Sequence, residues 1–416
     1  PDAVYFNPAG LTKLNDGFHF SLNTQTIFQS KDVENDYTYL RPTPKKYLGD
    51  IKVPVFPSLY ATWKKNKIAV SFGFNPVGGG GGATFEDGLP VLEMSLADMV
   101  PTANAFGTNL GITTTDYRRD VYFKGTSVYL GYQVGVTYQI SDVVSAYLGG
   151  RYVTVKNTYE GYLRDVQLNV GGNWTDISTA FSNFAAQYTT LSGQALAGAT
   201  AATGLSTTMG NFITGGLPST ATLLDVQNAG AIDEATRLQI EGGLTQLGID
   251  NTQNIGQLQT ATANRATTLT TQSQQAAGAA TQANSTAALT GAVFNQEAEV
   301  TQTGSGFTPI IGLNLNFEKL NIGIKYEFKT RIQVENDTKS DFIMGFDGAT
   351  PITMFPDGKK IDSDLPALLS VGVDYQLSDK FSATAGLHYY WDRPARYGKT
   401  INGEQVKYSE LIDNNY

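Results

Sequence analysis

The sequence has no cysteine and only two histidines among its 416 residues. Without cysteine the chain forms no disulfide and has no thiolate to act as a nucleophile or metal ligand, a composition compatible with an envelope protein. His19 and His388 stand in no nucleophile or metal-binding pattern, so each is expected to be an ordinary polar residue. We therefore expect no catalytic residue, no metal site and no cofactor, and we do not expect an enzyme.

The chain also lacks a basic tract and a long apolar run. Its net charge is −9, so nucleic acid is not an expected partner. No run of about 18 apolar residues is present, which excludes a helical membrane protein. The mean hydropathy of −0.20 still allows a membrane β-barrel, because half of each strand is polar. The sequence opens at Pro1 without a signal peptide, which suggests a mature or trimmed N-terminus.

The most informative stretch that is present runs from Leu320 to Val334, where apolar and polar residues alternate without a break. Successive side chains of a strand point to opposite faces, and a tilted strand needs about 9–11 residues to cross a bilayer. One long strand of a soluble sandwich is the alternative. We expect lipid contact for Leu320, Ile322, Ile324, Phe328 and Ile332, and a mutually compensating lumen wall from Lys325, Glu327, Lys329 and Arg331.

The same alternation recurs along the chain and predicts nine antiparallel strands, with an apparent slip of phase near Val153 and Val155 that suggests a bulge. Short turns alternate with long connections, as in outer-membrane barrels, whereas a sandwich has no reason for that asymmetry. Aromatic residues next to the short turns suit an interfacial girdle: Trp63, Tyr138, Phe317, Tyr375 and Phe381. The predicted strands are residues 17–30, 51–63, 67–75, 126–140, 143–158, 308–317, 320–334, 365–377 and 380–392.

Residues 169–305 differ in kind, because they are rich in Ala, Thr, Gln, Gly and Asn and contain no lysine. We interpret them as an inserted helical lobe, partly mobile, with disorder as the alternative because large apolar residues are few. The expected organisation is the end of an N-terminal plug (1–16), the first part of a barrel (17–168), the inserted outer lobe (169–305) and the barrel continued (306–416). Single-chain bacterial barrels have even strand counts, so C-terminal strands are expected beyond this sequence.

Several motifs together resemble the FadL family, the outer-membrane transporters of long-chain fatty acids and other hydrophobic compounds. Asn7-Pro8-Ala9 resembles the family motif at the end of the N-terminal plug, and Ser71–Pro76 resembles the third strand. Val53–Tyr60 resembles the second strand, and Leu365–Tyr375 resembles a later one. The match covers most of the chain outside residues 169–305, an insertion longer than we expect for the family.

The resemblance implies an all-β fold: a transmembrane antiparallel β-barrel of 14 strands in the full protein, about nine of them in this chain, in the bacterial outer membrane. An N-terminal plug closes such barrels, outer loops collect the ligand, and an inward kink in the third strand opens a lateral path into the membrane. Most of the plug would lie upstream of Pro1, so its ligand contacts have no counterpart in this sequence.

Three groups of residues are candidates for ligand binding or gating. We expect Asn7, Pro8 and Ala9 to contact the barrel wall, the alternative being a simple turn. We expect Gly73, Asn75 and Pro76 to form a wall opening, the alternative being a fraying strand end, since Pro removes a ladder donor and Gly marks bends. The third group consists of apolar residues at helical spacing: Leu92, Leu96, Met99 and Val100. We expect this helix to follow Pro90 and to end at Pro101. These side chains would form either the core of the loop or a groove that admits ligand.

Two minor candidates complete the set. The run Gly78–Gly82 lacks the Lys-Ser/Thr of a phosphate-binding loop, so we expect it to be a hinge that interrupts the third strand. Lys325, Lys329 or Arg331 could pair with a fatty carboxylate instead of with a neighbouring residue.

The resulting hypothesis is an outer-membrane channel that takes up long-chain fatty acids or similar hydrophobic compounds by lateral diffusion through the wall opening. Its partners would be hydrophobic small molecules and outer-membrane lipid. The alternative is a structural or docking barrel in an envelope protein-export or surface complex, with the inserted lobe as the surface for a protein partner.

Overall fold

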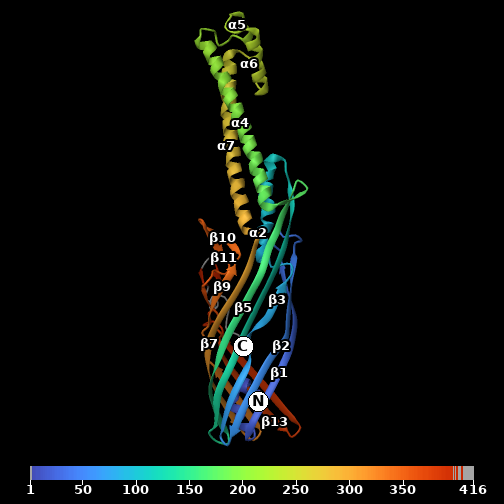
Figure 1. Ribbon diagram of the computed structural model, residues 1–416, viewed down its shortest axis with the longest axis vertical. Coiled ribbons are helices and arrows are strands. Elements are labelled where there is room, and N and C mark those ends of the chain that lie inside the picture. The colour runs from blue at the N-terminus through green and yellow to red at the C-terminus, as the bar shows by residue number, and fades with distance from the viewer. Residues whose placement is uncertain (1, 397, 399, 402–403, 406–416) are drawn as a thin grey trace. The chain divides into compact units, whose positions relative to one another are not determined.

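A computed structural model describes residues 2–396, 398, 400–401 and 404–405. The chain forms a curled antiparallel sheet of twelve strands and a helical insertion (Figure 1). Each of the nine predicted strands has a counterpart, although the one predicted at residues 320–334 ends at Glu327, and the nine are neighbours in chain order. They are β1 (Gly17–Asn35), β2 (Lys45–Lys65), β3 (Ile68–Phe85), β4 (Thr114–Gln139), β5 (Val144–Val170), β7 (Gln296–Asn316), β8 (Leu320–Glu327), β13 (Ala367–Ser378) and β14 (Phe381–Trp391).

Three short strands extend this sheet: β6 (Asn173–Asp176) pairs with β5, and β9 (Gln333–Ser340) pairs with β7 and with β12 (Lys360–Asp362). Two small hairpins stand apart from it. They are β10 (Ile343–Asp347) with β11 (Thr350–Thr353), and β15 (Thr400–Ile401) with β16 (Glu404–Gln405).

The four short turns lie where the sequence predicts them, joining β2 to β3, β4 to β5, β7 to β8 and β13 to β14. In the first turn Asn66 has a left-handed φ of 52°, and its N–H donates to the carboxylate of Asp16. Lys64 Nζ lies 2.7 Å from Asp16 Oδ1. Both contacts favour the charged carboxylate, and they hold the pKa of Asp16 below its ordinary value.

At the opposite ends most strands run further than predicted. The connection expected at residues 31–50 is largely strand, and β4 begins at Thr114 instead of at residue 126. The glycine run at 78–82 does not end the third strand, because β3 continues through it to Phe85. These extensions combine many polar residues and glycines with a few buried apolar side chains, among them Tyr47, Val121 and Val300, so their period-two signal in the sequence is weak.

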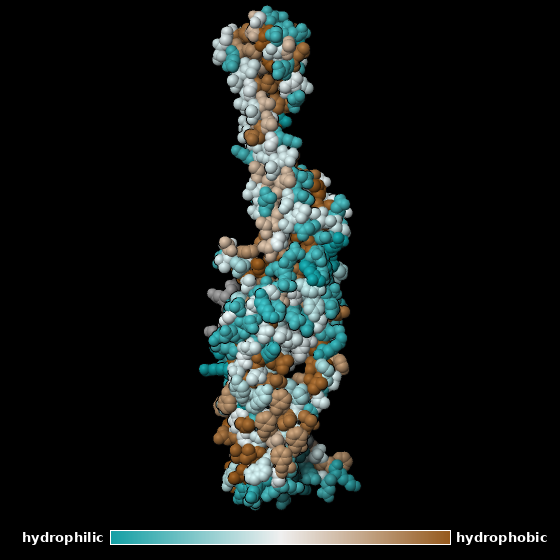
Figure 2. Space-filling model, viewed as in Figure 1, coloured by the Kyte–Doolittle hydropathy of each residue, from teal (hydrophilic) through white to brown (hydrophobic). Residues whose placement is uncertain are grey.

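The two faces of the sheet differ in chemistry. The inner face, on which the N-terminal segment lies, buries polar side chains that include Gln133, Thr137 and Arg151. The outer face exposes large apolar side chains, and Figure 2 shows hydrophobic residues gathered over the strands. The exposed residues include Phe18, Phe20, Leu22, Trp63, Val70, Val134, Val136, Tyr138, Leu148, Leu313, Phe317, Tyr375 and Phe381. Within the described residues no helix is long and apolar enough to cross a membrane.

The stretch from Leu320 to Val334 is not one strand, and this part of the prediction is wrong. Lys325 and Glu327 are buried on the inner face as predicted, but Ile332 is also buried there, with 1% of its surface exposed, whereas Arg331 is exposed. The register against β7 shifts by one residue between the Ile310–Glu327 pair and the Ser305–Gln333 pair. A one-residue slip turns every following side chain to the other face, so the predicted directions of Arg331 and Ile332 are inverted.

Pro309 explains where the slip occurs. It has no N–H for the ladder, and at this point Phe328 N–H donates to the Pro309 carbonyl 3.0 Å away. The bulge predicted near Val153 and Val155 is absent, because β5 pairs with β7 without a shift from Val144 to Leu163. Both valines instead point inward, where they pack on Ile332. The inner face of β5 changes here from polar to apolar residues, and in the sequence this change resembles a slip in the alternation.

By contacts the chain divides into two compact units, the second comprising residues 95–119 and 165–294. The predicted helical insertion is confirmed in this second unit as α4 (Ile177–Thr214), α5 (Leu223–Asn228), α6 (Glu234–Gln246) and α7 (Ile255–Val293). Residues 296–305, which we assigned to the lobe, belong to β7.

The helices of the insertion owe their bounds to caps and their pairing to small residues. Asp176, Thr222, Asp233 and Asn254 each accept a backbone N–H in the first turn of a helix. The long helices α4 and α7 lie side by side (Figure 1), and their contacts include Ala202 and Ala266. The Ser192 hydroxyl of α4 donates to the Ser273 carbonyl of α7 at 2.9 Å. Small side chains allow two helices to approach closely over their whole length.

The connection after β3 holds α2 (Pro90–Ala97), α3 (Met99–Gly107) and the 3-10 turn η2 (Thr108–Leu110). Pro90 starts a helix as expected, but Pro101 does not end one. It lies in the first turn of α3, where a backbone N–H would have no helical partner in any case, so proline is tolerated there.

Candidate functional site

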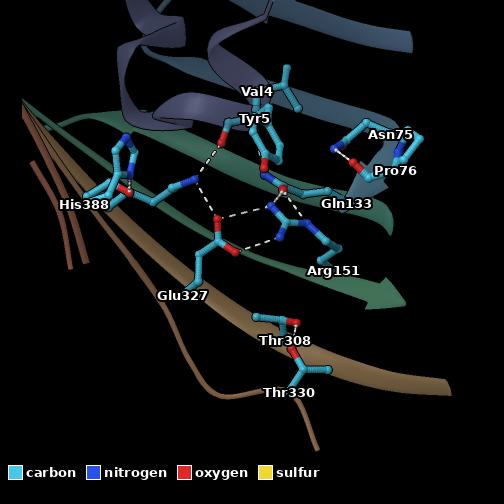
Figure 3. A network of polar contacts seen from close by, with 12 residues as sticks. Val4, Tyr5, Asn75, Pro76, Gln133, Arg151, Thr308, Glu327, Thr330 and His388 are labelled. Atoms are coloured by element: carbon cyan, nitrogen blue, oxygen red, sulfur yellow. Dashed lines mark hydrogen bonds and ion pairs between the residues drawn. The ribbon is translucent and has the colours of Figure 1, made fainter. Parts of the chain in front are cut away.

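The N-terminal segment, made of α1 (Ala3–Phe6) and the 3-10 helix η1 (Pro8–Lys13), lies against the inner face of the sheet (Figure 3). Four of its carbonyls accept hydrogen bonds from wall side chains. The donors are Gln133 to Val4 O (2.6 Å), Lys325 to Tyr5 O (2.7 Å), Thr137 to Pro8 O (2.7 Å) and Ser145 to Ala9 O (2.7 Å). Val4 and Tyr5 lie in the last turn of α1, where carbonyls have no partner within the helix, and here wall side chains supply the donors.

Asn7 links the two short helices to the wall. Its Oδ1 accepts the N–H of Ala9 at 3.2 Å, and its Nδ2 donates to the Leu313 carbonyl of β7 at 3.0 Å. An added Cβ would come within 2.6 Å of Asn7 Nδ2 at Gly323 and within 3.0 Å of Asn7 Oδ1 at Gly312, so these two glycines leave room for the side chain. Asn7, Pro8 and Ala9 are thus in direct contact with the sheet.

A buried charge cluster lies next to this segment (Figure 3). Arg151 on β5 contacts Glu327 on β8 at 2.6 Å, and Lys325 contacts the same carboxylate at 2.6 Å. The Arg151 guanidinium also donates to Gln133 Oε1, and both cations lie within 5.4 Å of the Tyr5 ring centre. The three side chains are each at most 10% exposed. With two cations and one anion, the trio keeps a net positive charge inside the sheet.

This cluster corrects the predicted lumen wall. Lys325 and Glu327 compensate each other as expected, but the third member is Arg151 and not Arg331. Lys329 lies 3.6 Å from the carboxylate of Asp364 instead. Arg151 had a signal in the sequence, since it is the one cation on the polar face of residues 143–152.

The ladder between β2 and β3 is interrupted. Its pairs stop at Leu59–Phe74 and resume at Ile51–Ala83, so residues 52–58 face residues 75–82 without pairing. The unpaired stretches contain Pro54, Pro57, Pro76 and the glycine run. Figure 2 shows a hollow bordered by hydrophobic residues at the level of the β2 and β3 labels of Figure 1. The ladder is therefore interrupted where the sequence predicts a wall opening, and within the interruption Val53 of β2 lies close to Gly81 of β3.

Gly73, Asn75 and Pro76, the residues predicted to form a wall opening, lie where the ladder stops after the Leu59–Phe74 pair. Asn75 is 6% exposed, and its Nδ2 donates to the Pro76 carbonyl at 2.9 Å (Figure 3), so the side chain satisfies backbone that the ladder leaves free. An added Cβ at Gly73 would lie 3.0 Å from Val4 Cγ1. Val4, rather than Asn7-Pro8-Ala9, is the residue of the N-terminal segment that contacts β3 beside the bend.

The third candidate group does not join this site. Leu92, Leu96 and Val100 are at most 7% exposed, which is the burial that loop core requires, and a role in admitting ligand stays a prediction. Beside Leu92, Glu93 is buried with Lys45 at 2.8 Å and accepts from the Tyr47 hydroxyl at 2.9 Å. The described part of the chain has no cluster of three His, Cys or carboxylate side chains that could hold a metal ion.

No known protein family and no curated protein sequence matches the chain. Solved structures similar to it include the toluene transporter TbuX of Ralstonia pickettii (TM-score 0.42, 12% identity, covering 94% of this chain and 67% of that one). A FadL homologue of Pseudomonas aeruginosa has a TM-score of 0.44 and 9% identity, and the match covers 97% of this chain and 67% of that one. The monoaromatic hydrocarbon channel CymD has a TM-score of 0.38 and 12% identity, with 95% of this chain and 65% of that one covered. The chain spans about two thirds of their lengths. No score reaches 0.5, so the likeness alone assigns no substrate.

Proposed function

We propose that this chain is part of a bacterial outer-membrane β-barrel that takes up hydrophobic compounds and releases them sideways into the membrane. The observation that carries the proposal is the interruption between β2 and β3 in a sheet whose outer face exposes apolar side chains. An apolar outer face suits contact with lipid, and a polar inner face suits a lumen. The N-terminal segment, bound to the inner face, would act as the plug.

The lateral route has a physical reason. A hydrophobic compound released through a watery lumen would have to cross to the periplasm in water, which costs about 25 cal/mol per Å² of apolar surface. A gap in the wall avoids that cost by passing the compound directly into lipid. Freed ladder groups must then find other partners, and the Asn75–Pro76 hydrogen bond, with three prolines that have no N–H, reduces their number.

The charge cluster supports fatty acids as the compound class. Arg151 and Lys325 share the single carboxylate of Glu327, so the cluster carries an uncompensated positive charge close to the bend in β3. Buried charges are stable when paired, and a fatty carboxylate is an anion that would complete the pairing while its chain stays in apolar surroundings.

The direct test is uptake of a labelled long-chain fatty acid by cells that do or do not produce the complete protein. We expect faster uptake in the producing cells. Equal uptake, in cells whose outer membranes contain the folded protein, would favour the docking barrel, in which the helical insertion binds a protein partner.

We further propose that the helical insertion stands outside the cell, because it connects β5 to β7 at the ends opposite the short turns. Within residues 169–305 only Arg237 and Arg265 are trypsin sites, so a protease of broad specificity suits the test. Treatment of intact cells is expected to cut the insertion and to spare the turn at residues 64–67. Cleavage at that turn with protection of the insertion would invert the topology.

A further inference from the structure

An apolar patch interrupts the polar inner face of the sheet. Val153 and Val155 of β5 pack against Ile332 and Val334, with Val77, Tyr129, Ile361 and Leu365 at its margin. Gly304 and Gly306 of β7 lie opposite Val155 and Val153 in the register. An added Cβ would meet Val334 at Gly304 and Ile332 at Gly306, so these glycines let the side chains meet across β7.

The patch reaches the interruption in the wall. Val77 follows Pro76 directly and belongs to the unpaired stretch of β3. The same side chain would lie within 2.7 Å of a Cβ added at Gly131 on β4, which places it on the side of the wall that faces Arg151. A compound that leaves through the interruption from inside therefore passes Val77, and beyond Val77 the apolar surface continues to Ile332.

Ile332 belongs to a segment that is bound more to itself than to the wall. We call residues 328–332 and 363–365 the inner flap. Asp364, fully buried, accepts the Ile332 N–H at 3.0 Å, the Ser363 N–H donates to the Ile332 carbonyl at 2.8 Å, and Thr330 and Leu365 exchange two backbone hydrogen bonds of 3.0 Å. These bonds hold the flap together as one piece.

The contacts from the flap to the wall are fewer. Besides the Phe328 N–H at its start, they include a contact between the hydroxyls of Thr308 and Thr330, a 2.6 Å hydrogen bond between Tyr129 and Ser363, and the apolar packing of Ile332 and Leu365. Asp364 also accepts hydrogen bonds from the Arg396 N–H and Nε, at 3.2 and 3.1 Å, which stabilise the flap.

We propose that the inner flap is a gate on the route to the wall interruption, and that a hydrophobic compound opens it by taking the place of Ile332 against Val153 and Val155. The inference rests on the proposed uptake function and adds its inner control point. Apolar contacts suit this exchange, because a hydrocarbon can replace a side chain with little change in buried apolar surface. A compound that binds the open arrangement better than the closed one shifts the equilibrium towards opening.

The chain has no native cysteine, so a single engineered disulfide can test the gate. The Thr308 and Thr330 hydroxyls are in contact, so the double variant Thr308→Cys/Thr330→Cys is expected to cross-link the flap to β7. Uptake of labelled fatty acid by the oxidised double variant should fall at least about tenfold, since opening requires this contact to separate, and return on reduction. Each single cysteine variant, which cannot cross-link within the chain, should take up fatty acid at the same rate under oxidising and reducing conditions.

A second variant approaches the gate from the opposite direction. Ile332→Ala weakens the packing that closes the flap, and uptake of the same fatty acid is expected to rise roughly tenfold. Arg331→Ala, the exposed neighbour, is the matched control and should leave uptake unchanged. Uptake that is equal in the oxidised and reduced double variant, or in Ile332→Ala and the parent, overturns the gate alone. Absence of uptake in the parent overturns the proposed function itself.

Discussion

Deletion of Gly79 and Gly80 is expected to abolish uptake of hydrophobic compounds while leaving the sheet folded. Between the Pro76–Leu130 and Gly81–Ser127 pairs, β3 advances five residues and β4 only three. The two extra residues let β3 bend away from β2 at the interruption. Their removal would bring β3 into one continuous register with β4, and because two is an even number, every side chain would keep its face.

The expected loss follows from the geometry of the exit. With β3 straightened, the segment that now faces residues 52–58 without pairing would lie closer to β2, and a closed ladder leaves no lateral path. Uptake of labelled fatty acid is the measurement, and heat-dependent migration on gels reports that the barrel is folded. A folded deletion variant that takes up fatty acid at the parent rate would exclude the interruption as the exit.

Gly80→Ala is the matched control for this deletion. The substitution keeps the length of β3, the backbone at Gly80 is not left-handed, and an added Cβ meets no heavy atom within 4 Å. Uptake should therefore remain that of the parent. Substitution at Gly73 is less informative, because valine there would press on Val4 and disturb the N-terminal segment as well as the bend.

The strand order was predictable because the signal for it is local. Period-two alternation and the four short turns place nine strands in chain order, and chain order is also their order in the sheet. The interruption was predictable for a related reason, since Pro76 and the adjacent glycines are residues that weaken a ladder wherever they occur. The helices of the insertion followed from composition and spacing, whereas its boundary at Gln296 did not, because polar strand and polar loop look alike.

What the sequence did not reveal depends on partners distant in the chain. The inward direction of Ile332 results from a one-residue slip opposite Pro309, and alternation in one strand contains no information about its register with the next. The contact of Val4 with β3 and the meeting of Arg151 with Glu327, 176 residues apart, likewise require the folded sheet. The charged residues of this cluster can be read from the sequence, but which of them pair with one another cannot.

Substitution of Glu327 by Gln is expected to cause the largest loss of stability among single changes in the sheet. The variant keeps the shape of the side chain but leaves Arg151 and Lys325 buried together without an anion. Removal of one partner from a buried ion pair typically costs about 3–5 kcal/mol. The free energy of unfolding, followed by tryptophan fluorescence during denaturant titration of protein folded into lipid vesicles, should fall by an amount of that order.

The cause of this loss can be separated from a general effect of changing a glutamate. Adding Lys325→Met to Glu327→Gln removes one of the two unpaired cations and should restore part of the lost stability, although the Tyr5 carbonyl then loses its donor. Glu299→Gln is the matched control, because Glu299 pairs with Lys339 on the exposed surface, where an ion pair contributes little. If Glu327→Gln unfolds at the same denaturant concentration as Glu299→Gln, the buried cluster does not stabilise the sheet. The position of the N-terminal segment must then depend on its other three wall donors, Gln133, Thr137 and Ser145.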